Sequence, residues 1–143
     1  KGQHLTFYNV FKTGKGRDDF SGQFPQYFDG TGIVPQTFPI ILLTGSETFS
    51  AGNYFVYMMK NLPNVITVGE RTGGGGGAVN DVKLPNSWLF SYTWFKSYSA
   101  KGENMEFGAA PDCKVKVSYK IGLEKDSVIL KALEVLDSIN NVF

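Results

Sequence analysis

Residues Pro39 to Met59 read PIILLTGSETFSAGNYFVYMM. The apolar run that opens this stretch is short and bounded by Pro and Gly, which is typical of a strand buried on both faces in a parallel sheet. A polar turn follows from Thr44 to Thr48, and apolar and small residues then recur at helical spacing until Asn61-Leu-Pro63. The pattern predicts a strand, a tight turn, and a helix with Ser50 in its first turn.

Outward from this stretch, strand patterns continue along the chain. A second apolar run, Val65 to Val68, follows the helix closely, so strand, helix and strand form a crossover unit with two parallel strands. Val79 to Leu84 and Ser87 to Lys96 flank Pro85-Asn86 and alternate roughly, which predicts a hairpin. The expected fold class is therefore α/β, with an added β-hairpin.

The two ends of the chain differ in regularity. His4 to Phe11 is compatible with a strand, whereas Lys12 to Phe38 holds glycines and aromatic residues without a steady period. Cys113 to Tyr119 alternates as a half-exposed strand. The last segment gives the clearest helix pattern, with Asp126 as its N-cap and a wide apolar stripe.

The chain is expected to form one domain that changes character at residue 38. We expect residues 1–38 to be an irregular N-terminal segment and residues 39–143 to be the C-terminal part of the same domain. Only two or three strands are long and apolar, which is few for a free-standing α/β domain. The domain is thus expected to be incomplete, a piece that packs against the N-terminal half of the same polypeptide or against a second copy.

Composition narrows the classes of function. The 143 residues are 42% hydrophobic and 19% charged with a formal net charge of +1, which gives no electrostatic footprint for nucleic acid. No apolar run approaches the roughly 20 residues that span a bilayer, so no transmembrane segment is expected. A single cysteine excludes an internal disulfide, and one His with one Cys excludes a His/Cys zinc site. We expect neither a metal nor a cofactor.

Ser50 is the strongest candidate for chemistry and has two interpretations. A serine at the start of a helix can attack a carbonyl group, because unpaired N–H groups there can hold an oxyanion. Serine is also a favoured helix N-cap, and Thr48 can serve in its place. Thr48 stands where the G-x-S-x-G nucleophile elbow requires Gly, which disfavours the α/β-hydrolase fold.

A serine nucleophile needs a base, and the chain contains one histidine. This residue, His4, lies in the N-terminal segment, where a surface or packing role is the usual one. Lys60 lies at the far end of the Ser50 helix, on the order of 15 Å away at the rise of an α-helix, which is out of reach. Neither residue is assigned as the base.

The glycine run and two acidic residues are the remaining candidates. Gly73 to Gly77 lack the Lys-Ser/Thr ending of a P-loop, so we interpret them as a flexible loop that borders a substrate cleft, with Gly73, Gly74 and Gly75 at the cleft. Glu103 and Glu106 lie in a turn, where each can orient a base or be a solvated charge.

Five segments occur together in one order. They are Ile40-Ile-Leu-Leu-Thr-Gly-Ser-Glu-Thr-Phe-Ser-Ala-Gly52, Val68-Gly-Glu-Arg-Thr-Gly-Gly74, Leu84-Pro-Asn86, Phe107-Gly-Ala-Ala-Pro-Asp112 and Lys125-Asp-Ser-Val-Ile-Leu-Lys-Ala-Leu133. In this order they resemble the S41 peptidases, the family of C-terminal processing and tricorn-type serine proteases. The resemblance implies a ClpP/crotonase-like core in which Ser50 attacks a peptide carbonyl. It also implies that the oxyanion is held by the N–H of Ala51 and by a D-x-R-x-N-x-G-G loop upstream of this chain.

The chain departs from part of the family pattern. The C-terminal processing branch uses a lysine about 25 residues after the serine, but position 75 is glycine and no lysine lies between Asn61 and Asp81. The tricorn-like arrangement of Ser, His, a second Ser and Glu is the nearer resemblance. There the His comes from upstream of the Gly-rich loop, which His4 does not match. The Glu precedes a G-x-x-P-D segment, which points to Glu106, with Glu103 as second choice.

The resemblance thus implies a tricorn-like serine endopeptidase that acts on a peptide or protein in the bacterial cell envelope, periplasmic or secreted. The isolated chain is expected to be inactive, because the base and the Gly-rich loop lie upstream. The alternative is a catalytically silent S41-like module that binds peptides or glycans through the aromatic residues Trp88, Phe90, Tyr92, Trp94 and Phe95. A crotonase-like function with thioesters is weaker, since no nucleotide pocket is evident.

Overall fold

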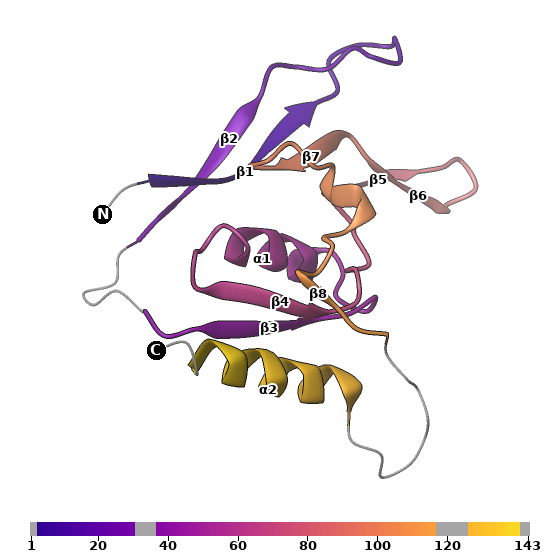
Figure 1. Cartoon of the computed structure of the whole chain (residues 1–143). Coiled ribbons are helices and arrows are strands. Elements are labelled where there is room, and N and C mark those ends of the chain that lie inside the picture. Colours follow the sequence, from indigo (N-terminus) through magenta and orange to yellow (C-terminus); the bar gives the residue numbers. More distant parts are fainter. Residues whose placement is uncertain (1–2, 31–36, 117–125, 141–143) are drawn as a thin grey trace.

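The computed structural model describes residues 3–30, 37–116 and 126–140 of the chain. In order, its elements are β1 (Gln3–Phe11), β2 (Phe24–Asp29), β3 (Ile40–Thr44), α1 (Ala51–Met59), β4 (Val65–Gly69), β5 (Val79–Lys83), β6 (Leu89–Thr93), β7 (Phe95–Ser99), the 3₁₀ turn η1 (Met105–Phe107), β8 (Cys113–Lys114) and α2 (Ser127–Asn140). Figure 1 shows α1 between a parallel sheet and an antiparallel sheet, with α2 on the far side of the parallel sheet. The fold is therefore a mixed α/β fold with small sheets.

The parallel sheet confirms the predicted strand-helix-strand unit. Its strand order is β3-β4-β8, and β3 pairs with β4 in parallel from Ile40 opposite Val65 to Thr44 opposite Gly69. The expectation that the first strand is buried on both faces is wrong within the described chain. Leu43 is 45% exposed, because β3 forms an edge of this sheet.

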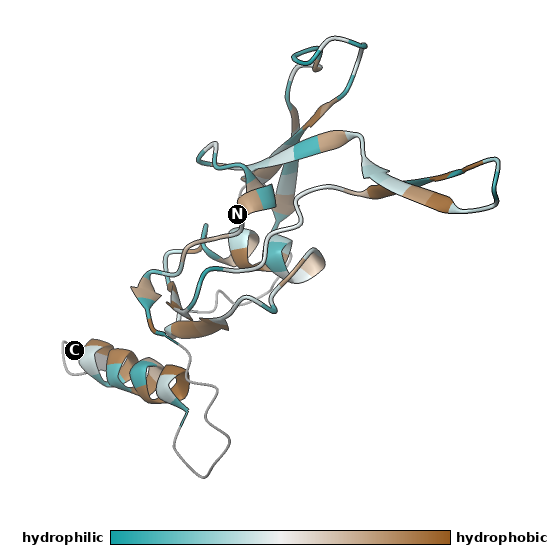
Figure 2. Ribbon diagram, turned by 90° about the vertical axis from the view of Figure 1, so that its right-hand side faces the viewer, coloured by the Kyte–Doolittle hydropathy of each residue, from teal (hydrophilic) through white to brown (hydrophobic). Residues whose placement is uncertain are grey.

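The two helices cover opposite faces of the parallel sheet. Val56 and Tyr57 of α1 form a buried cluster with Met105 and Ala109, and Leu42 of β3 and Phe7 of β1 pack against it. On the other face, Val128 and Ala132 of α2 pack on Val68 of β4. Figure 2 shows hydrophobic and hydrophilic residues alternating along α2, as this one-sided burial requires. Neither helix of the described residues is long and apolar enough to cross a membrane.

The antiparallel sheet corrects two predictions. The segment expected to be irregular contains β2, which pairs with β1 and is exposed along its whole length. Strands exposed in this way lack the alternation by which a strand is predicted. The second arm of the predicted hairpin also divides at Trp94: Leu89–Thr93 pairs with β5, whereas Phe95–Ser99 pairs with β1.

The C-terminal elements agree in part with the sequence. The predicted strand 113–119 is a strand only over Cys113–Lys114, and residues 117–119 lie outside the described residues. Asp126 caps α2 as predicted, because its Oδ1 accepts hydrogen bonds from the N–H groups of Val128, at 2.8 Å, and Ile129, at 3.4 Å.

Asp112 ties the end of α1 to the parallel sheet. Its carboxylate accepts hydrogen bonds from Lys60 Nζ at 2.6 Å, from Thr67 N–H at 2.9 Å and from Thr67 Oγ1 at 2.6 Å. Partial burial acts to raise the pKa of Asp112, but these hydrogen bonds outweigh it and hold the pKa below the ordinary value. The carboxylate is thus more stable ionised in the folded chain than in the unfolded chain.

The lowered pKa of Asp112 predicts a pH dependence of stability. Its contribution is present above the unfolded-state pKa and is lost as the pH falls through the folded-state pKa. Because the group is partly exposed, Asp112→Asn is expected to lower the free energy of unfolding at pH 7 by about 1 kcal/mol, and by less in acid. Urea unfolding between pH 3 and pH 7 measures this effect. Asp137→Asn, on the exposed face of α2, is the control, and an equal loss in both variants would contradict the prediction.

Candidate active site

Ser50 occupies a strained position between β3 and α1. Its backbone has φ 53° and ψ −116°, a region that costs a residue other than glycine about 1–3 kcal/mol. Ser50 is exposed, and its side chain makes no capping hydrogen bond with α1 in the described chain. The Thr48 hydroxyl instead accepts a hydrogen bond from Gly45 N–H within the turn. Neither side chain is therefore used as the cap that the alternative interpretation requires.

The glycine run holds the Ser50 turn in place. Ser50 N–H donates to the carbonyl oxygen of Gly74 at 2.9 Å, and Gly73 N–H donates to the carbonyl oxygen of Thr48 at 2.9 Å. Gly74 has φ +84°, and a Cβ atom there would lie 2.0 Å from the carbonyl oxygen of Glu106. Only glycine fits this position, because the backbone of η1 is packed directly against it.

The glycines divide into two groups. Gly73 and Gly74 pair with the Ser50 turn, and a Cβ atom at Gly75 would lie 2.8 Å from the ring of Phe49. The next two glycines, Gly76 and Gly77, line the two cavities near the turn. The assignment of Gly73, Gly74 and Gly75 to the substrate cleft stays a prediction, and their contacts give them a structural role in positioning Ser50.

A cavity of about 480 Å³ lies over the start of α1. Besides Ser50 and Ala51, the residues lining it come from α1, β1, β7 and the end of the glycine run: Phe7, Asn9, Tyr54, Phe55, Met58, Gly77, Ala78 and Phe95. Ala51 is the first residue of α1, and the first N–H groups of a helix have no acceptor within the helix. The cavity thus combines a serine hydroxyl with the positive end of a helix and apolar walls.

Tyr54 is the polar group of α1 nearest in sequence to Ser50 on this cavity wall. Burial raises its pKa, the hydrogen bond with Ser97 acts in the opposite direction, and the Glu106 carboxylate adds to the rise. Tyr54 therefore stays protonated at neutral pH and cannot serve as a base for Ser50 there.

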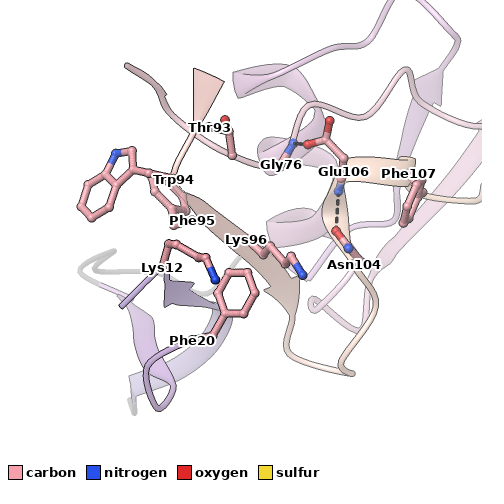
Figure 3. A pocket seen from close by; sticks show the side chains of 10 residues that line it. All are labelled: Lys12, Phe20, Gly76, Thr93, Trp94, Phe95, Lys96, Asn104, Glu106 and Phe107. Carbon is pink, nitrogen blue, oxygen red and sulfur yellow. Dashed lines mark hydrogen bonds between the residues drawn. The ribbon is translucent and has the colours of Figure 1, made fainter. Parts of the chain in front are cut away.

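Glu106 lines a second cavity of about 400 Å³, to which Gly76 of the glycine run also contributes (Figure 3). Its Oε2 atom accepts a hydrogen bond from Gly76 N–H at 2.8 Å, and its N–H donates to Asn104 Oδ1 at 3.0 Å. Phe95 lines both this cavity and the Ser50 cavity. Glu106 is thus bound to the same glycine run that positions Ser50.

Glu103, the second choice, lies elsewhere. Its carboxylate accepts a hydrogen bond from the Ser99 hydroxyl at 3.3 Å, and it lines a small pocket with Tyr57 and Lys60. The Glu103 side chain does not line the Ser50 cavity.

A buried network that the sequence analysis missed fixes the turn bearing Glu106. Asn53 is fully buried in α1, where its Nδ2 donates to the carbonyl oxygen of Met105 at 2.8 Å. Thr72 Oγ1 donates to Asn53 Oδ1 at 2.6 Å and accepts from Ala109 N–H at 2.6 Å. An amide between apolar positions of a helix was the available signal, since a buried polar group requires partners.

The residues considered as bases do not line the Ser50 cavity. His4 lines another cavity, of about 140 Å³, that shares Phe55 and Met58 with the Ser50 cavity, and Lys60 is paired with Asp112. The described residues lining the Ser50 cavity include no histidine and no lysine. The described residues also contain no group of three or more His, Cys, Asp or Glu that could hold a metal ion.

A serine in a strained turn at a helix start, held by a glycine run, agrees with the family resemblance of the sequence. The model of peptidase family S41 matches residues 7–115, which is most of the chain. The chain belongs to peptidase family S41. This match includes β1 from Phe7 onward, the Ser50 turn, the glycine run, both acidic candidates and β8.

Three individual proteins show the extent of the similarity. A peptidase candidate from Parabacteroides merdae ATCC 43184 superposes with a TM-score of 0.86 and 33% identity, over 94% of this chain and 43% of that chain. A photosystem II D1 C-terminal processing protease has the same fold, with a TM-score of 0.57 and 20% identity over 80% of this chain and 28% of its own. An uncharacterized protein of Chlamydia muridarum is 36% identical over 69 residues, 48% of this chain and 11% of that protein. The chain thus spans less than half of each.

The fit of Gly74 predicts a sharp effect of one methyl group. Gly74→Ala places Cβ against the Glu106 carbonyl in a backbone conformation that alanine rarely adopts, so it is expected to lower stability by about 1–3 kcal/mol and displace the Ser50 turn. Reaction of Ser50 with a fluorophosphonate and thermal unfolding measure the two effects. Gly22→Ala is the matched control, because a Cβ atom there meets nothing within 4 Å. Equal behaviour of the two variants would refute this account of Gly74.

Proposed function

We propose that this chain is part of a tricorn-like serine endopeptidase in which Ser50 attacks the carbonyl carbon of a peptide bond. The observation that carries the proposal is the strained backbone of Ser50, whose hydroxyl is left out of helix capping and lines a cavity at the start of α1. Strained residues persist where the surrounding structure fixes them, and they cluster at active sites. Membership of peptidase family S41 supports peptide hydrolysis as the reaction.

In this proposal the oxyanion of the tetrahedral intermediate is bound by Ala51 N–H at the positive end of α1. Glu106 orients the histidine that acts as general base and takes the proton of Ser50. That histidine and a second oxyanion donor come from residues outside these 143. The absence of His and Lys from the described lining of the Ser50 cavity supports this division, as does the 43% coverage of the Parabacteroides merdae chain.

In this proposal, residues outside these 143 also cover apolar side chains that are exposed in the described chain. Leu43 on the sheet edge and Phe28 on β2 are 45% and 56% exposed. We assign their cover to the N-terminal half of the same polypeptide, or to a second copy, around a ClpP/crotonase-like core. A location in the bacterial cell envelope, periplasmic or secreted, is a further proposal that rests on the family resemblance.

A second candidate function has an observation in its favour. Trp88, Phe90 and Trp94 on and beside the β5–β6 hairpin are 72%, 57% and 44% exposed, and the rings of Phe90 and Tyr92 stack with centroids 6.1 Å apart. Clustered exposed aromatic side chains mark interaction sites, and in this second candidate function they bind a peptide or a glycan. A catalytically silent module would use this hairpin and leave Ser50 unreactive.

Labelling of Ser50 separates the two functions. A fluorophosphonate is expected to react with Ser50 in the full-length protein, and Ser50→Ala should abolish labelling and lower kcat for peptide cleavage by roughly 10⁴- to 10⁶-fold. Ser46→Ala removes an exposed hydroxyl from the same turn and serves as the control. An unlabelled Ser50 in an otherwise folded full-length protein would favour the binding module.

The isolated 143-residue chain is expected to be inactive, because it lacks the proposed base. Loss of a catalytic base costs serine proteases several orders of magnitude in rate. Incubation of the purified chain with casein, followed by mass spectrometry, measures any cleavage. Appreciable cleavage that Ser50→Ala abolishes would contradict the assignment of the base to residues outside the chain.

A further inference from the structure

Two hydrogen bonds connect three polar side chains, those of Tyr54, Ser97 and Asn9, at the wall of the Ser50 cavity. The hydroxyl oxygen of Tyr54 lies 2.5 Å from Ser97 Oγ, and Ser97 Oγ donates to Asn9 Oδ1 at 2.7 Å. Ser97 is fully buried, whereas Tyr54 and Asn9 both line the cavity. These hydrogen bonds join α1, β7 and β1, which lie far apart in sequence.

The number of hydrogens on each group determines which group donates in each of the two hydrogen bonds. A serine hydroxyl has one hydrogen, and that of Ser97 goes to Asn9. Tyr54 must therefore be the donor in the bond with Ser97. Because this bond uses only the hydrogen of the Tyr54 hydroxyl, its oxygen can still accept a hydrogen bond from another group.

Asn9 is oriented by the same bond. Its Oδ1 atom accepts from Ser97, so its Nδ2 atom, with two hydrogens, is the group left for a ligand. Among the described residues that are not exposed, no buried side-chain nitrogen or oxygen lacks a hydrogen-bond partner. The Nδ2 atom of Asn9, for which no hydrogen bond to the described residues is found, is therefore not fully buried, and Asn9 itself is part-buried and lines the cavity.

Packing holds both groups still. The ring of Phe7 meets the ring of Tyr54 edge to face, with centroids 5.1 Å apart and an interplanar angle of 76°. Asn9 and Ser97 are directly opposite partners in the β1–β7 ladder. One acceptor and one donor are thus preorganised on the same wall, so a ligand need not order them on binding.

We propose that Tyr54 and Asn9 form an amide-binding pair that positions the substrate beside Ser50. The Tyr54 hydroxyl accepts the N–H of a substrate amide, and Asn9 Nδ2 donates to an amide carbonyl oxygen. Tyr54 lies in the first turn of α1, where its N–H donates to the carbonyl oxygen of Ser50 at 3.0 Å, and Asn9 of β1 lines the same cavity as both residues. The inference rests on the proposed peptidase function and makes both side chains positioning residues. The amide belongs either to the peptide backbone or to an Asn or Gln side chain.

The test uses the full-length protein and one peptide that it cleaves in a casein digest. Analogues replace one backbone amide at a time by an ester, which removes the N–H, and a second set replaces each Gln or Asn by Glu or Asp. One ester, or one side-chain replacement, is expected to raise KM about 5- to 10-fold in the wild type, the worth of one hydrogen bond. Tyr54→Phe should raise KM for the parent peptide by the same factor. Because the hydrogen bond is then already lost, the sensitive analogue should raise KM no further in this variant.

Two further variants keep the test sharp. Tyr98→Phe removes a hydroxyl from β7 outside the cavity, where the ring stacks on Tyr8, and should behave as wild type. Ser97→Ala leaves Tyr54 and Asn9 in place but removes the hydroxyl that orients them. In this variant the ratio of KM for the analogue to KM for the parent peptide should be smaller than in the wild type. The inference is overturned if Tyr54→Phe weakens cleavage of the amide and ester peptides equally, or if no analogue differs from its parent.

Fluorophosphonate labelling distinguishes this failure from failure of the proposed function. Tyr54→Phe is expected to retain labelling of Ser50, because the probe carries no amide at this position. An unlabelled wild-type Ser50 together with an uncleaved digest would reject the peptidase function and the amide-binding pair with it. Labelled Ser50 with no difference between the amide and its analogues would reject the amide-binding pair alone.

Discussion

The hydrogen bond from Ser50 N–H to the carbonyl oxygen of Gly74 is the constraint on which the candidate site depends. A serine with positive φ does not keep that conformation by its own preference, so the glycine run must hold it. The run can approach so closely only because Gly73 and Gly74 carry no side chain, and it is itself packed against the backbone of Glu106. Three segments of the chain are thereby locked together at one place.

The rest of the fold supports this contact from two sides. Because β3 and β4 are parallel, their carboxyl ends lie at the same end of the sheet. The Ser50 turn and the glycine run, which follow these two strands, therefore start side by side. Behind them, the buried Asn53–Thr72 pair and the Asp112 tie join α1 to the chain around η1 and β8. An unpaired buried amide would be costly, so this side of α1 has one well-defined arrangement.

Local signals in the sequence predicted the parts that local chemistry decides. The strand-helix-strand unit, the turn carrying Ser50, the hairpin and the Asp126 cap all follow from patterns within a few residues. The pairing of β2 with β1 and the change of sheet at Trp94 depend on partners far away in the chain, which no local pattern encodes. The same reason hid Ser97, an unremarkable serine in sequence whose role comes from Tyr54 and Asn9.

The change from one sheet to another at Trp94 has a consequence for how sites of this kind diverge. Two successive strands that meet at Trp94 have different roles: β6 is the second arm of the hairpin, and Phe95 at the start of β7 lines both cavities. The Ser50 turn belongs to a different sheet and is held by the glycine run. Insertions or deletions in the hairpin can therefore reshape the rim around a bound chain without moving the nucleophile, so selectivity and reactivity are free to evolve separately.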